Sequence, residues 1–582
     1  MKNNFRSIKY RWHYKHPDID KVNEIASSCR VPKAIAELML KKGFKSKEDI
    51  DLFFDGSLKA LRNPFELSDM EKAAERIAKA VTEREHICIY GDYDVDGVTA
   101  TALMYIFLMR CGANVSYYIP NRLEEGYGLN KDAIHEIAGR GTGLIVTVDC
   151  GISAAEEVLE AVNLGMDIIV TDHHQPSESL PVAACAIINP MKENDGYPNK
   201  TLAGVGVAFK TVMAVRFILR KNGYFKKEVP NIKNLLDIVT LGTIADVMPL
   251  IDENRIMVKH GLALMSGDNA RIGIDELKKT VGINNVRMKT HNIGFQLAPR
   301  INAMGRMGSS DKSLKLLITQ NRKEARSLAG ELDNENKYRQ TIEREILQKT
   351  FELIEKNKYD SDDAIVIAED GWHPGVIGIV ASRVVDKYYR PTVILTDDNG
   401  VYKGSARSIP GFHLYNELNA LSDMLISFGG HKYAAGVKID KSRVDEFRDK
   451  FKKAVSSSVN KEELIPEINI DAVIEAKDIN NGIMTWLDKL EPYGQGNKEP
   501  VFYMASVEKY QPEIYVGRDG CHLKCFFEKD GTVFDAIGFN MKEYAPIIAE
   551  NKKFDMLFSL THNAWKNIKT IQLNLKDIRK AD

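Results

Sequence analysis

The chain has 582 residues, of which 44% are hydrophobic and 28% are charged, and its formal net charge at pH 7 is −1. This composition is that of an ordinary soluble protein, and its near-neutrality excludes a general attraction to nucleic acids or anionic membranes, so that a polyanion would need a local basic patch. No run of 18 or more apolar residues is present, which excludes a membrane-spanning helix.

The location and redox state of the chain follow from its N-terminus and its cysteines. The first residues, MKNNFRSIKYRWHYKHPD, are basic but lack the apolar core of a signal peptide. The seven cysteines are scattered along the chain, which argues against a disulfide framework. We therefore expect a cytoplasmic protein.

The first half of the chain changes its pattern near residue 82. Residues 1–75 are predicted to be mainly helical, because AIAELMLKKG and EDIDLFF have apolar residues at helical intervals. Beyond them strands and helices alternate, which is typical of a parallel sheet with helices on its faces. We predict strands at residues 86–90, 114–120, 143–151, 166–174 and 185–190, and helices at residues 97–111, 129–141 and 153–165.

The second half of the chain predicts further domains. Residues 202–265 are largely helical, and the charged stretch at 321–358 has apolar residues at the spacing of one long connecting helix. A smaller α/β unit follows, in which GSARS and GGHKYAAG are predicted to be loops. Several short strands near the end predict a small β-barrel, an OB-fold. The predicted fold class is therefore α/β. We predict five segments along the chain: an N-terminal segment (1–75), a parallel-sheet domain (76–320), the connecting helix (321–358), a second α/β domain (359–465) and the barrel (466–582).

The stretch GDYDVDG places Asp92, Asp94 and Asp96 close together, and such like charges call for a cation. An EF-hand calcium loop also has glycine at its sixth position, as Gly97 is here, but it needs a bidentate glutamate at its twelfth, where this chain has Leu103. The preceding residues also predict a strand instead of the helix that an EF-hand needs. A solvated acidic turn is the simplest alternative for this stretch alone.

Ionisable residues follow two further predicted strands. Asp149 follows GLIVTV, and Asp172, His173 and His174 follow MDIIVT, while Asp246 lies near the end of a predicted helix in GTIADVMPL. The carboxyl ends of parallel strands meet at one edge of a sheet, so we expect these groups to lie together. Each aspartate alone could be a helix cap, but the set suits two divalent ions such as Mn²⁺ or Mg²⁺, which act on phosphate esters as a pair.

The motifs GDYDVDG, TVDCG, TDHHQP and TIADVMPL, in this order, resemble those of the DHH phosphoesterase superfamily, and GGHKYAAG resembles the signature of its associated DHHA1 domain. From about residue 70 to residue 580, with the β-rich tail included, the chain resembles the single-stranded-DNA-specific 5′→3′ exonucleases of that superfamily. GDYDVDG has an aspartate where many small DHH enzymes have a histidine, and in this too it is similar to those exonucleases.

The resemblance implies a role for each matched residue. The implied metal ligands are Asp92, Asp94, Asp96, Asp149, His173 and Asp246. Asp149 would bridge the two ions, and His174 would orient the scissile phosphate, which makes Asp149, His173 and His174 the predicted catalytic residues. The expected cofactors are two divalent ions, Mn²⁺ or Mg²⁺; histidine ligation leans toward Mn²⁺, but the sequence does not rank the two.

The resemblance also implies a grip on DNA. Ser405 and Arg407 would hold a 5′-terminal phosphate together with Arg122, although Arg407 could instead form a surface ion pair. The other predicted substrate-binding residues are Arg306, His373, Gly429, Gly430 and His431. In the tail, Tyr503, Phe526 and Trp565 could stack on bases, but such aromatics more often belong to a core.

The leading hypothesis is a metal-dependent 5′→3′ exonuclease that degrades single-stranded DNA to 5′-mononucleotides by two-metal hydrolysis, in DNA repair and recombination. The alternatives are a DHH phosphodiesterase acting on short oligonucleotides or cyclic dinucleotides, and a non-catalytic DNA-binding scaffold. The β-rich tail argues for a polymer substrate. A helicase and a single-strand-binding protein are the protein partners that the hypothesis suggests, and the linking helix suggests a monomer.

Overall fold

The structure is a computed structural model that describes residues 4–44, 46–122, 125–126, 128–177, 179–268, 270–307, 309–565 and 568–581. Its contacts divide the chain into two compact units. We call them the parallel-sheet unit, formed by Gly56–Ile342 and Pro492–Lys498, and the barrel unit, formed by Met1–Asp55, Glu343–Glu491 and Glu499–Asp582. The chain therefore enters the parallel-sheet unit twice, the second time for a short segment.

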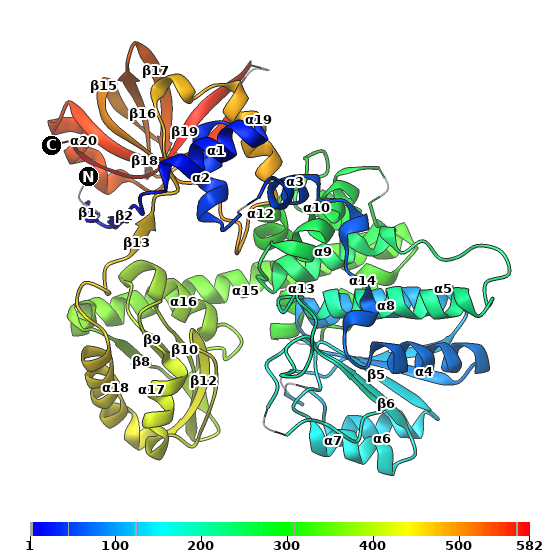
Figure 1. The fold of residues 1–582 in the computed structure, drawn as a ribbon. Helices are drawn as coiled ribbons and strands as arrows, with labels where there is room; N and C mark the ends of the chain where they lie inside the picture. Colours follow the sequence, from blue (N-terminus) through cyan, green and yellow to red (C-terminus); the bar gives the residue numbers. More distant parts are fainter. Residues whose placement is uncertain are drawn as a thin grey trace. The chain divides into compact units, whose positions relative to one another are not determined.

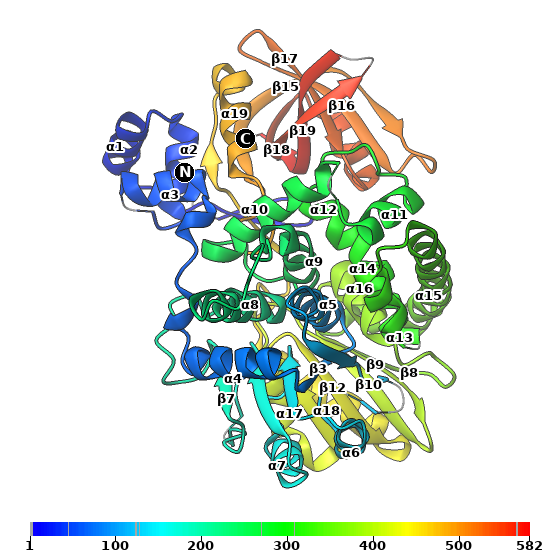
Figure 2. The same cartoon turned by 90° about the vertical axis from the view of Figure 1, so that its right-hand side faces the viewer.

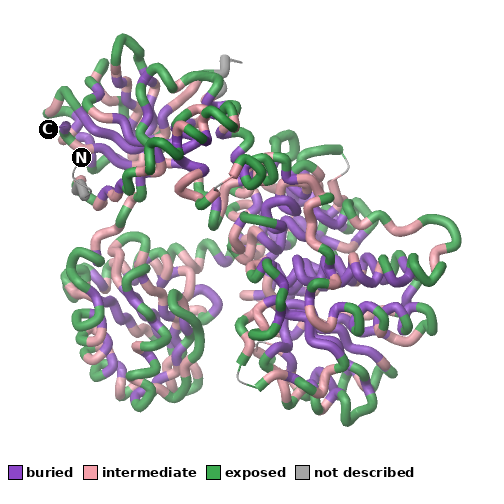
Figure 3. The backbone as a smooth tube through the Cα atoms, in the orientation of Figure 1, coloured by how far each residue is buried: buried purple, intermediate pink, exposed green. Residues whose placement is uncertain are grey.

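Five parallel strands form the central sheet of the parallel-sheet unit, in the order β4-β3-β5-β6-β7. Their bounds are His86–Gly91 (β3), Asn114–Tyr118 (β4), Leu144–Val148 (β5), Asp167–Thr171 (β6) and Ala186–Ile188 (β7). The central strands are apolar and buried on both faces, as Figure 3 shows, because helices cover both sides of the sheet.

Two groups of helices cover this sheet (Figures 1 and 2). On one face lie α4 (Met70–Glu83), α5 (Val95–Arg110) and α8 (Gly204–Lys221), and on the other lie α6 (Lys131–Gly139) and α7 (Ala155–Asn163). Neighbouring strand residues point to opposite faces, so that Leu144 and Ile145 enter different hydrophobic clusters. This layering confirms the predicted parallel α/β fold.

The rest of the parallel-sheet unit is a helical layer beside α5 and α8. It contains α9 (Leu236–Ala245), α10 (Asp252–Ser266), α11 (Ile272–Thr280), α12 (Thr290–Asn292), the π-helical turn η4 (Ile293–Leu297), α13 (Ala298–Met307) and α14 (Asp311–Ile318). The long helix α15 (Arg322–Asn357) then runs out of this unit and into the barrel unit, and it spans the stretch in which the sequence predicts one connecting helix.

A second α/β layer lies in the barrel unit, with strands in the order β11-β12-β10-β9-β8. The strands are Ile365–Ala368 (β8), Thr392–Asp398 (β9), Val401–Arg407 (β10), Ser427–Gly430 (β11) and Ala434–Asp440 (β12), and the helices are Ile377–Tyr388 (α16), Leu414–Ala420 (α17) and Val444–Ser458 (α18). The loop predictions for GSARS and GGHKYAAG were wrong in part: the first lies mostly within β10, and the second forms the β11–β12 hairpin. Their small residues fit between paired strands, as Gly404 does against Leu395 and Val437.

The C-terminal strands form a closed barrel in the order β15-β16-β17-β19-β18, with β18 pairing back to β15. They are Phe502–Val516 (β15), His522–Lys529 (β16), Thr532–Gly538 (β17), Lys553–Trp565 (β18) and Ile568–Lys580 (β19), and α20 (Ala545–Glu550) links β17 to β18. This confirms the predicted OB-fold. The first strand is longer than predicted, because β-bulges let one strand bend and pair with two neighbours.

Only the part of the N-terminal segment up to Asp55 belongs with this barrel, because the chain enters the parallel-sheet unit at Gly56. It contains α1 (Ile19–Cys29), α2 (Lys33–Lys41) and α3 (Lys47–Asp55), but it starts with the strands β1 (Asn4–Arg6) and β2 (Arg11–His13), which the helical prediction missed. Strand β2 pairs with β13 (Glu467–Asn469), and the fully buried Trp12 donates its indole N–H to Asp577. This pairing joins distant parts of the sequence, so that no local pattern reveals it. The remaining elements here are β14 (Ala472–Val473) and α19 (Asn481–Leu490).

Candidate metal centre

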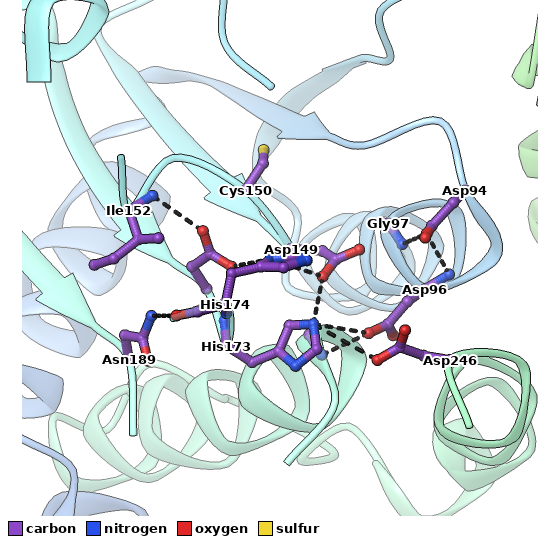
Figure 4. A network of polar contacts seen from close by, with 12 residues as sticks. Asp94, Asp96, Gly97, Asp149, Cys150, Ile152, His173, His174, Asn189 and Asp246 are labelled. Atoms are coloured by element: carbon purple, nitrogen blue, oxygen red, sulfur yellow. Dashed lines mark hydrogen bonds and ion pairs between the residues drawn. The ribbon is translucent and has the colours of Figure 1, made fainter. Parts of the chain in front are cut away.

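The predicted acidic residues gather at one edge of the parallel sheet, where three neighbouring strands end (Figure 4). Strand β3 leads into GDYDVDG, β5 leads into Asp149, and β6 leads into Asp172, His173 and His174. Asp246 joins them as the C-terminal cap of α9. These residues therefore lie together because parallel strands bring their carboxyl ends to the same edge of a sheet, as the sequence predicted.

His173 lies at the centre of the cluster. Its Nε2 atom is 3.1 Å from Asp149 Oδ1, 3.8 Å from Asp96 Oδ2 and 3.7 Å from Asp246 Oδ2. Three sets of side chains have possible ligand atoms within 4.8 Å of one another: Asp149 with His173 and His174, Asp96 with His173 and Asp246, and Asp92 with Asp94 and Asp149. All six residues predicted as metal ligands occur in these sets, and their ligand roles remain predictions.

Asp149 has an unusual backbone conformation. Its φ is 62°, in the left-handed region that non-glycine residues seldom adopt, and the residue is 1% exposed. A β-carbon on Gly204 would lie 2.4 Å from Asp149 Oδ1, which is a steric clash. Position 204 must therefore be glycine for the Asp149 carboxylate to lie where it does. Sequence reasoning missed Gly204, although the sequence GVG at the start of a helix is a signal of close backbone approach.

Asp96 and Asp94, both predicted metal ligands, also accept hydrogen bonds from the backbone. The buried Asp96 carboxylate accepts from the backbone N–H groups of Gly204 (2.6 Å) and Val205 (2.9 Å), at the positive N-terminal end of α8. Asp94 caps α5 through Oδ1, which accepts from the N–H groups of Asp96 and Gly97. A carboxylate has two oxygens with several lone pairs, so that neither arrangement prevents metal binding.

The carboxylates of the cluster repel one another, and the positive groups of the cluster do not offset their negative charge. Burial, followed by repulsion from Asp94, raises the pKa of Asp92 to about 8 and that of Asp246 to about 7. Burial, followed by repulsion from Asp246, raises the pKa of Asp96 well above the usual range, and burial, followed by repulsion from Asp96, does the same for the pKa of Asp149. Asp92 Oδ1 and Asp149 Oδ1 are buried and accept no hydrogen bond from any residue that the structure describes. Buried carboxylate oxygens of this kind, with an imidazole beside them, fit divalent cations.

Binding of Mn²⁺ is expected to release protons near neutral pH. Below a raised pKa the carboxyl holds a proton that the ion must displace, so that the apparent affinity should rise with pH through the window of about 7 to 8 given by Asp246 and Asp92. Titration calorimetry at pH 7 in two buffers of different ionisation enthalpy measures the release. Equal heats in both buffers would contradict the expectation, and at pH 9 the difference between buffers should shrink.

The two histidines of the cluster have different surroundings. Burial, and then the charge of His174, lowers the pKa of His173 to about 4, which keeps it neutral as a metal ligand must be. Burial alone would lower the pKa of His174, but the hydrogen bond from its Nδ1 to Asp172 Oδ1 (2.7 Å) outweighs this and raises the pKa to about 9. The side chain of His174 is also the more exposed of the two, at 38% against 8%.

Asp172 fixes the orientation of His174. It is 1% exposed, and its carboxylate accepts from the N–H groups of Ile152 (3.0 Å) and His174 (3.1 Å) as well as from the His174 ring. Burial alone would raise its pKa, but these hydrogen bonds outweigh burial and lower it. Unlike Asp149, Asp172 is therefore a carboxylate whose charge the protein itself stabilises.

Two of the predicted DNA-binding arginines lie beside the GDYDVDG loop. The Arg122 guanidinium carbon is 5.1 Å from the centre of the Tyr93 ring. Helix α13, which ends just after Arg306, approaches the same tyrosine: a β-carbon on Gly305 would lie 2.5 Å from its carbonyl oxygen. Basic side chains thus reach the rim of the acidic cluster, where a phosphate could be held.

The other predicted phosphate contacts lie in the barrel unit. Arg407 donates from Nη1 to Ser405 Oγ (2.9 Å), and a β-carbon on Gly378 would lie within 3.1 Å of both side chains. Gly378 belongs to the first turn of α16, and the preceding loop holds His373, whose Nδ1 accepts from the N–H of Gly375. The structure therefore brings Ser405, Arg407 and the positive end of a helix together, which is an arrangement that suits a phosphate.

The hairpin residues Gly429, Gly430 and His431 are exposed. Gly430 has a φ of 146°, and a β-carbon there would lie 2.4 Å from the carbonyl oxygen of Ala434, so that its glycine is required by the hairpin itself. The N–H of His431 donates to that same carbonyl oxygen (2.8 Å). The substrate role of these residues remains a prediction.

The tail offers aromatics other than those predicted. Tyr503 is 5% exposed and belongs to the core, as the sequence favoured, whereas the side chain of Trp565 lies outside the described residues. The exposed rings are Tyr510 (56%), Tyr515 (50%) and Phe539 (57%). None of these three rings was among the aromatics predicted from the sequence, and two of them, Tyr510 and Tyr515, lie on β15.

The chain is similar to known proteins in each of its large domains. Three family models match: "DHH family, N-terminal domain" at residues 86–243, "DHHA1 domain" at 362–457 and "RecJ OB domain" at 470–577. No helix among the described residues is long and apolar enough to cross a membrane.

Among the relatives, the "Single-stranded-DNA-specific exonuclease RecJ" of Bacillus subtilis is 38% identical over 98% of this chain and 71% of its own length. The protein of the same name from Salmonella typhimurium is 33% identical over 98% of this chain and its whole length. The crystal structure of RecJ from Thermus thermophilus in complex with Mn²⁺ matches 99% of this chain and 80% of its own chain, at 29% identity and a TM-score of 0.83. The structure of the same protein in complex with Mg²⁺ matches 99% of this chain and 79% of its own chain, at 28% identity and a TM-score of 0.76.

Proposed function

Since the chain belongs to the RecJ family of single-stranded-DNA-specific exonucleases, we propose that it removes 5′-mononucleotides from single-stranded DNA, from the 5′ end inward, in DNA repair and recombination. The observation that carries the proposal is the buried cluster of carboxylates around His173, whose negative charge calls for cations at one edge of the sheet.

The residues that would hold two divalent ions are those predicted from the sequence: Asp92, Asp94, Asp96, Asp149, His173 and Asp246. Bound Mn²⁺ or Mg²⁺ supplies activation of water and neutralisation of charge at a phosphodiester. Asp149 faces both the Asp92–Asp94 side and the His173 side of the cluster, which supports its role as the bridge.

His174 would position the phosphate instead of completing the metal shell. Its Nδ1 is hydrogen-bonded to Asp172, and we propose that the other ring nitrogen, Nε2, donates to a phosphate oxygen. Because Asp172 favours the protonated ring, with its pKa raised to about 9, His174 can offer that donor throughout the neutral pH range. A fixed, charged donor of this kind stabilises charge that develops in a phosphoryl-transfer transition state.

The polarity of the reaction would come from a grip on the terminal phosphate. Ser405, the guanidinium of Arg407 and the N-terminal end of α16 form a set of donors that suits a phosphate dianion. A grip on the 5′-terminal phosphate would make that end the one from which nucleotides are released. Arg122, Arg306, His373 and the β11–β12 hairpin are proposed to contact the DNA further along, and Tyr510 and Tyr515 to stack on its bases.

The proposal predicts that release of mononucleotides depends on a free 5′ end. Purified protein with Mn²⁺ is given single-stranded DNA whose 5′ or 3′ end is blocked in separate reactions, with Asp149→Ala as the inactive control. Release should continue with the 3′ block and stop with the 5′ block. Degradation that ignores the 5′ block would remove the proposed phosphate grip, and cleavage of di- or trinucleotides only would favour a small-substrate phosphodiesterase.

The finer parts of the proposal concern the setting of the enzyme. We propose that it acts in the cytoplasm as a monomer, with a helicase to supply single strands and a single-strand-binding protein to keep them open. We also propose that the five segments bounded at residues 75, 320, 358 and 465 work as separate domains, with the barrel holding the strand beyond the cut.

A further inference from the structure

A short turn returns from the tail to the parallel-sheet unit. It consists of residues 492–498, with the sequence PYGQGNK, and we call it the docking turn. Gly494 and Asn497 close it by exchanging two backbone hydrogen bonds of 3.0 and 3.1 Å, and the buried Asn497 side chain donates to the carbonyl of Pro492 (2.9 Å). The turn is therefore a compact unit, although the chain on both sides of it belongs to the barrel unit.

The docking turn contacts the segment that follows Asp246. The N–H of Leu250 donates to the carbonyl of Gln495 (2.7 Å). A β-carbon on Gly494 would lie 2.7 Å from Leu250 Cδ1, and one on Gly496 would lie 3.1 Å from Pro249 Cβ. Gly496 also has a φ of 72°, which favours glycine. Both glycines thus allow a contact that any side chain would disturb.

The contacted segment starts with a strained helix end. Helix α9 ends at Asp246 in a Schellman arrangement: the N–H of Val247 donates to Ile244, and that of Met248 donates to Thr243, each at 3.1 Å. The position with positive φ is normally glycine, but here it is Val247, at 56°. A β-branched residue is disfavoured in this conformation, and Val247 is 66% exposed, so that burial of its side chain does not offset the strain.

Two further hydrogen bonds hold the docking turn and the loop that it contacts. Thr290, the first residue of α12, donates its hydroxyl to the carbonyl of Tyr493 (2.6 Å). The amide of Asn254 donates to the carbonyl of Pro249 (3.1 Å), which anchors the same loop from α10. The strained cap is therefore followed, within a few residues, by a loop that is fixed on two sides.

We propose that the docking turn positions the metal ligand Asp246, by holding the loop that keeps the strained cap of α9 closed. Without the turn, Val247 would relax toward negative φ, the cap would open, and the Asp246 carboxylate would leave the group it forms with Asp96 and His173. The turn thereby makes the geometry of the metal centre depend on a segment contributed by the tail. This inference rests on the proposed function, because it assumes that Asp246 binds a divalent ion.

The test uses the full-length protein with Gly496→Ala, and Gly223→Ala as the matched control. Gly223 has a similar φ of 69° in the same unit, but a β-carbon there meets nothing within 4 Å. Gly496→Ala should weaken Mn²⁺ binding by roughly tenfold, the effect typical of losing a group that orients a ligand, and Gly223→Ala should leave it within about twofold. Calorimetric titration without DNA gives the affinities, and amide hydrogen exchange at Leu250 should become faster only in Gly496→Ala.

Two further variants keep the proposal open to contradiction. Val247→Gly removes the strain, so that in the Gly496→Ala background it should restore most of the lost Mn²⁺ affinity. Thr290→Val removes one anchor of the turn without a clash, and should weaken Mn²⁺ binding in the same direction even if Gly496→Ala does not fold. Unchanged Mn²⁺ affinity with faster Leu250 exchange would overturn the proposal. A wild-type protein that binds Mn²⁺ but cleaves no DNA would instead overturn the proposed function alone.

Discussion

Asp149→Asn should abolish hydrolysis of single-stranded DNA and, at the same time, stabilise the metal-free protein. Asparagine keeps the shape and tolerates the positive φ of this position, but it removes a buried charge whose Oδ1 accepts no hydrogen bond within the described part of the chain. If Asp149 bridges the two ions as proposed, loss of its carboxylate should lower kcat by roughly a hundredfold to a thousandfold or more, as loss of one preorganised electrostatic group does.

The stabilisation has a definite pH dependence. A carboxyl whose folded pKa is raised destabilises the folded state above its unfolded pKa, and the cost grows with pH until the folded pKa is reached. Asp149→Asn should therefore raise the free energy of unfolding by about 2 kcal/mol near neutral pH and by less near pH 5. Thermal denaturation in the presence of a chelator, at two pH values, measures this.

Asp172→Asn is the matched control for that comparison. Asp172 is as buried as Asp149, but its hydrogen bonds lower its pKa, so that it stabilises the folded state at pH values above its unfolded pKa. Its replacement should destabilise the metal-free protein at neutral pH, which is the opposite sign. If both variants have a lower free energy of unfolding than the wild type, then the charge of Asp149 does not destabilise the metal-free protein, and this account is wrong.

The two adjacent histidines should give opposite phenotypes. His173→Ala removes the group that faces three carboxylates, and it should weaken Mn²⁺ binding by more than about tenfold. His174→Ala should leave Mn²⁺ affinity within about threefold but lower kcat by roughly a hundredfold, because it removes a donor to the phosphate. Calorimetry and steady-state kinetics on the same preparations separate the two effects.

Asp172→Ala provides a check on the role of His174. It leaves the imidazole in place but removes the acceptor that orients it, so that kcat should fall while the Mn²⁺ affinity changes little. If His174→Ala weakens Mn²⁺ binding as strongly as His173→Ala does, then His174 is a metal ligand, and the set of Asp149, His173 and His174 describes one coordination shell.

The position of the acidic cluster could be predicted because it follows from topology. A strand ends before Asp92, Asp149 and Asp172, and parallel pairing of β3, β5 and β6 brings these ends to one edge whatever the details of packing. The closed barrel could also be predicted, because its alternating strands are separated by turns. The resemblance to the DHH superfamily supplied what topology does not, namely the separate roles of His173 and His174.

Features that depend on distant contacts could not be predicted. The requirement for glycine at position 204 arises only from the approach of Asp149, which is 55 residues away in the sequence. The small residues of GSARS predict a loop where the structure has β10, because the pairing partners β9 and β12 decide the structure of this stretch. The docking turn looks like an ordinary glycine-containing linker, and its role appears only where it contacts Leu250.

The central claim is that this cluster holds two divalent ions bridged by Asp149. The most direct test is anomalous diffraction at the manganese absorption edge, from crystals of the full-length protein grown with Mn²⁺. We expect two anomalous peaks about 3.5–4 Å apart, both within bonding distance of Asp149, with His173 beside one of them and His174 outside both shells. A single peak, or peaks away from Asp149, would contradict the account.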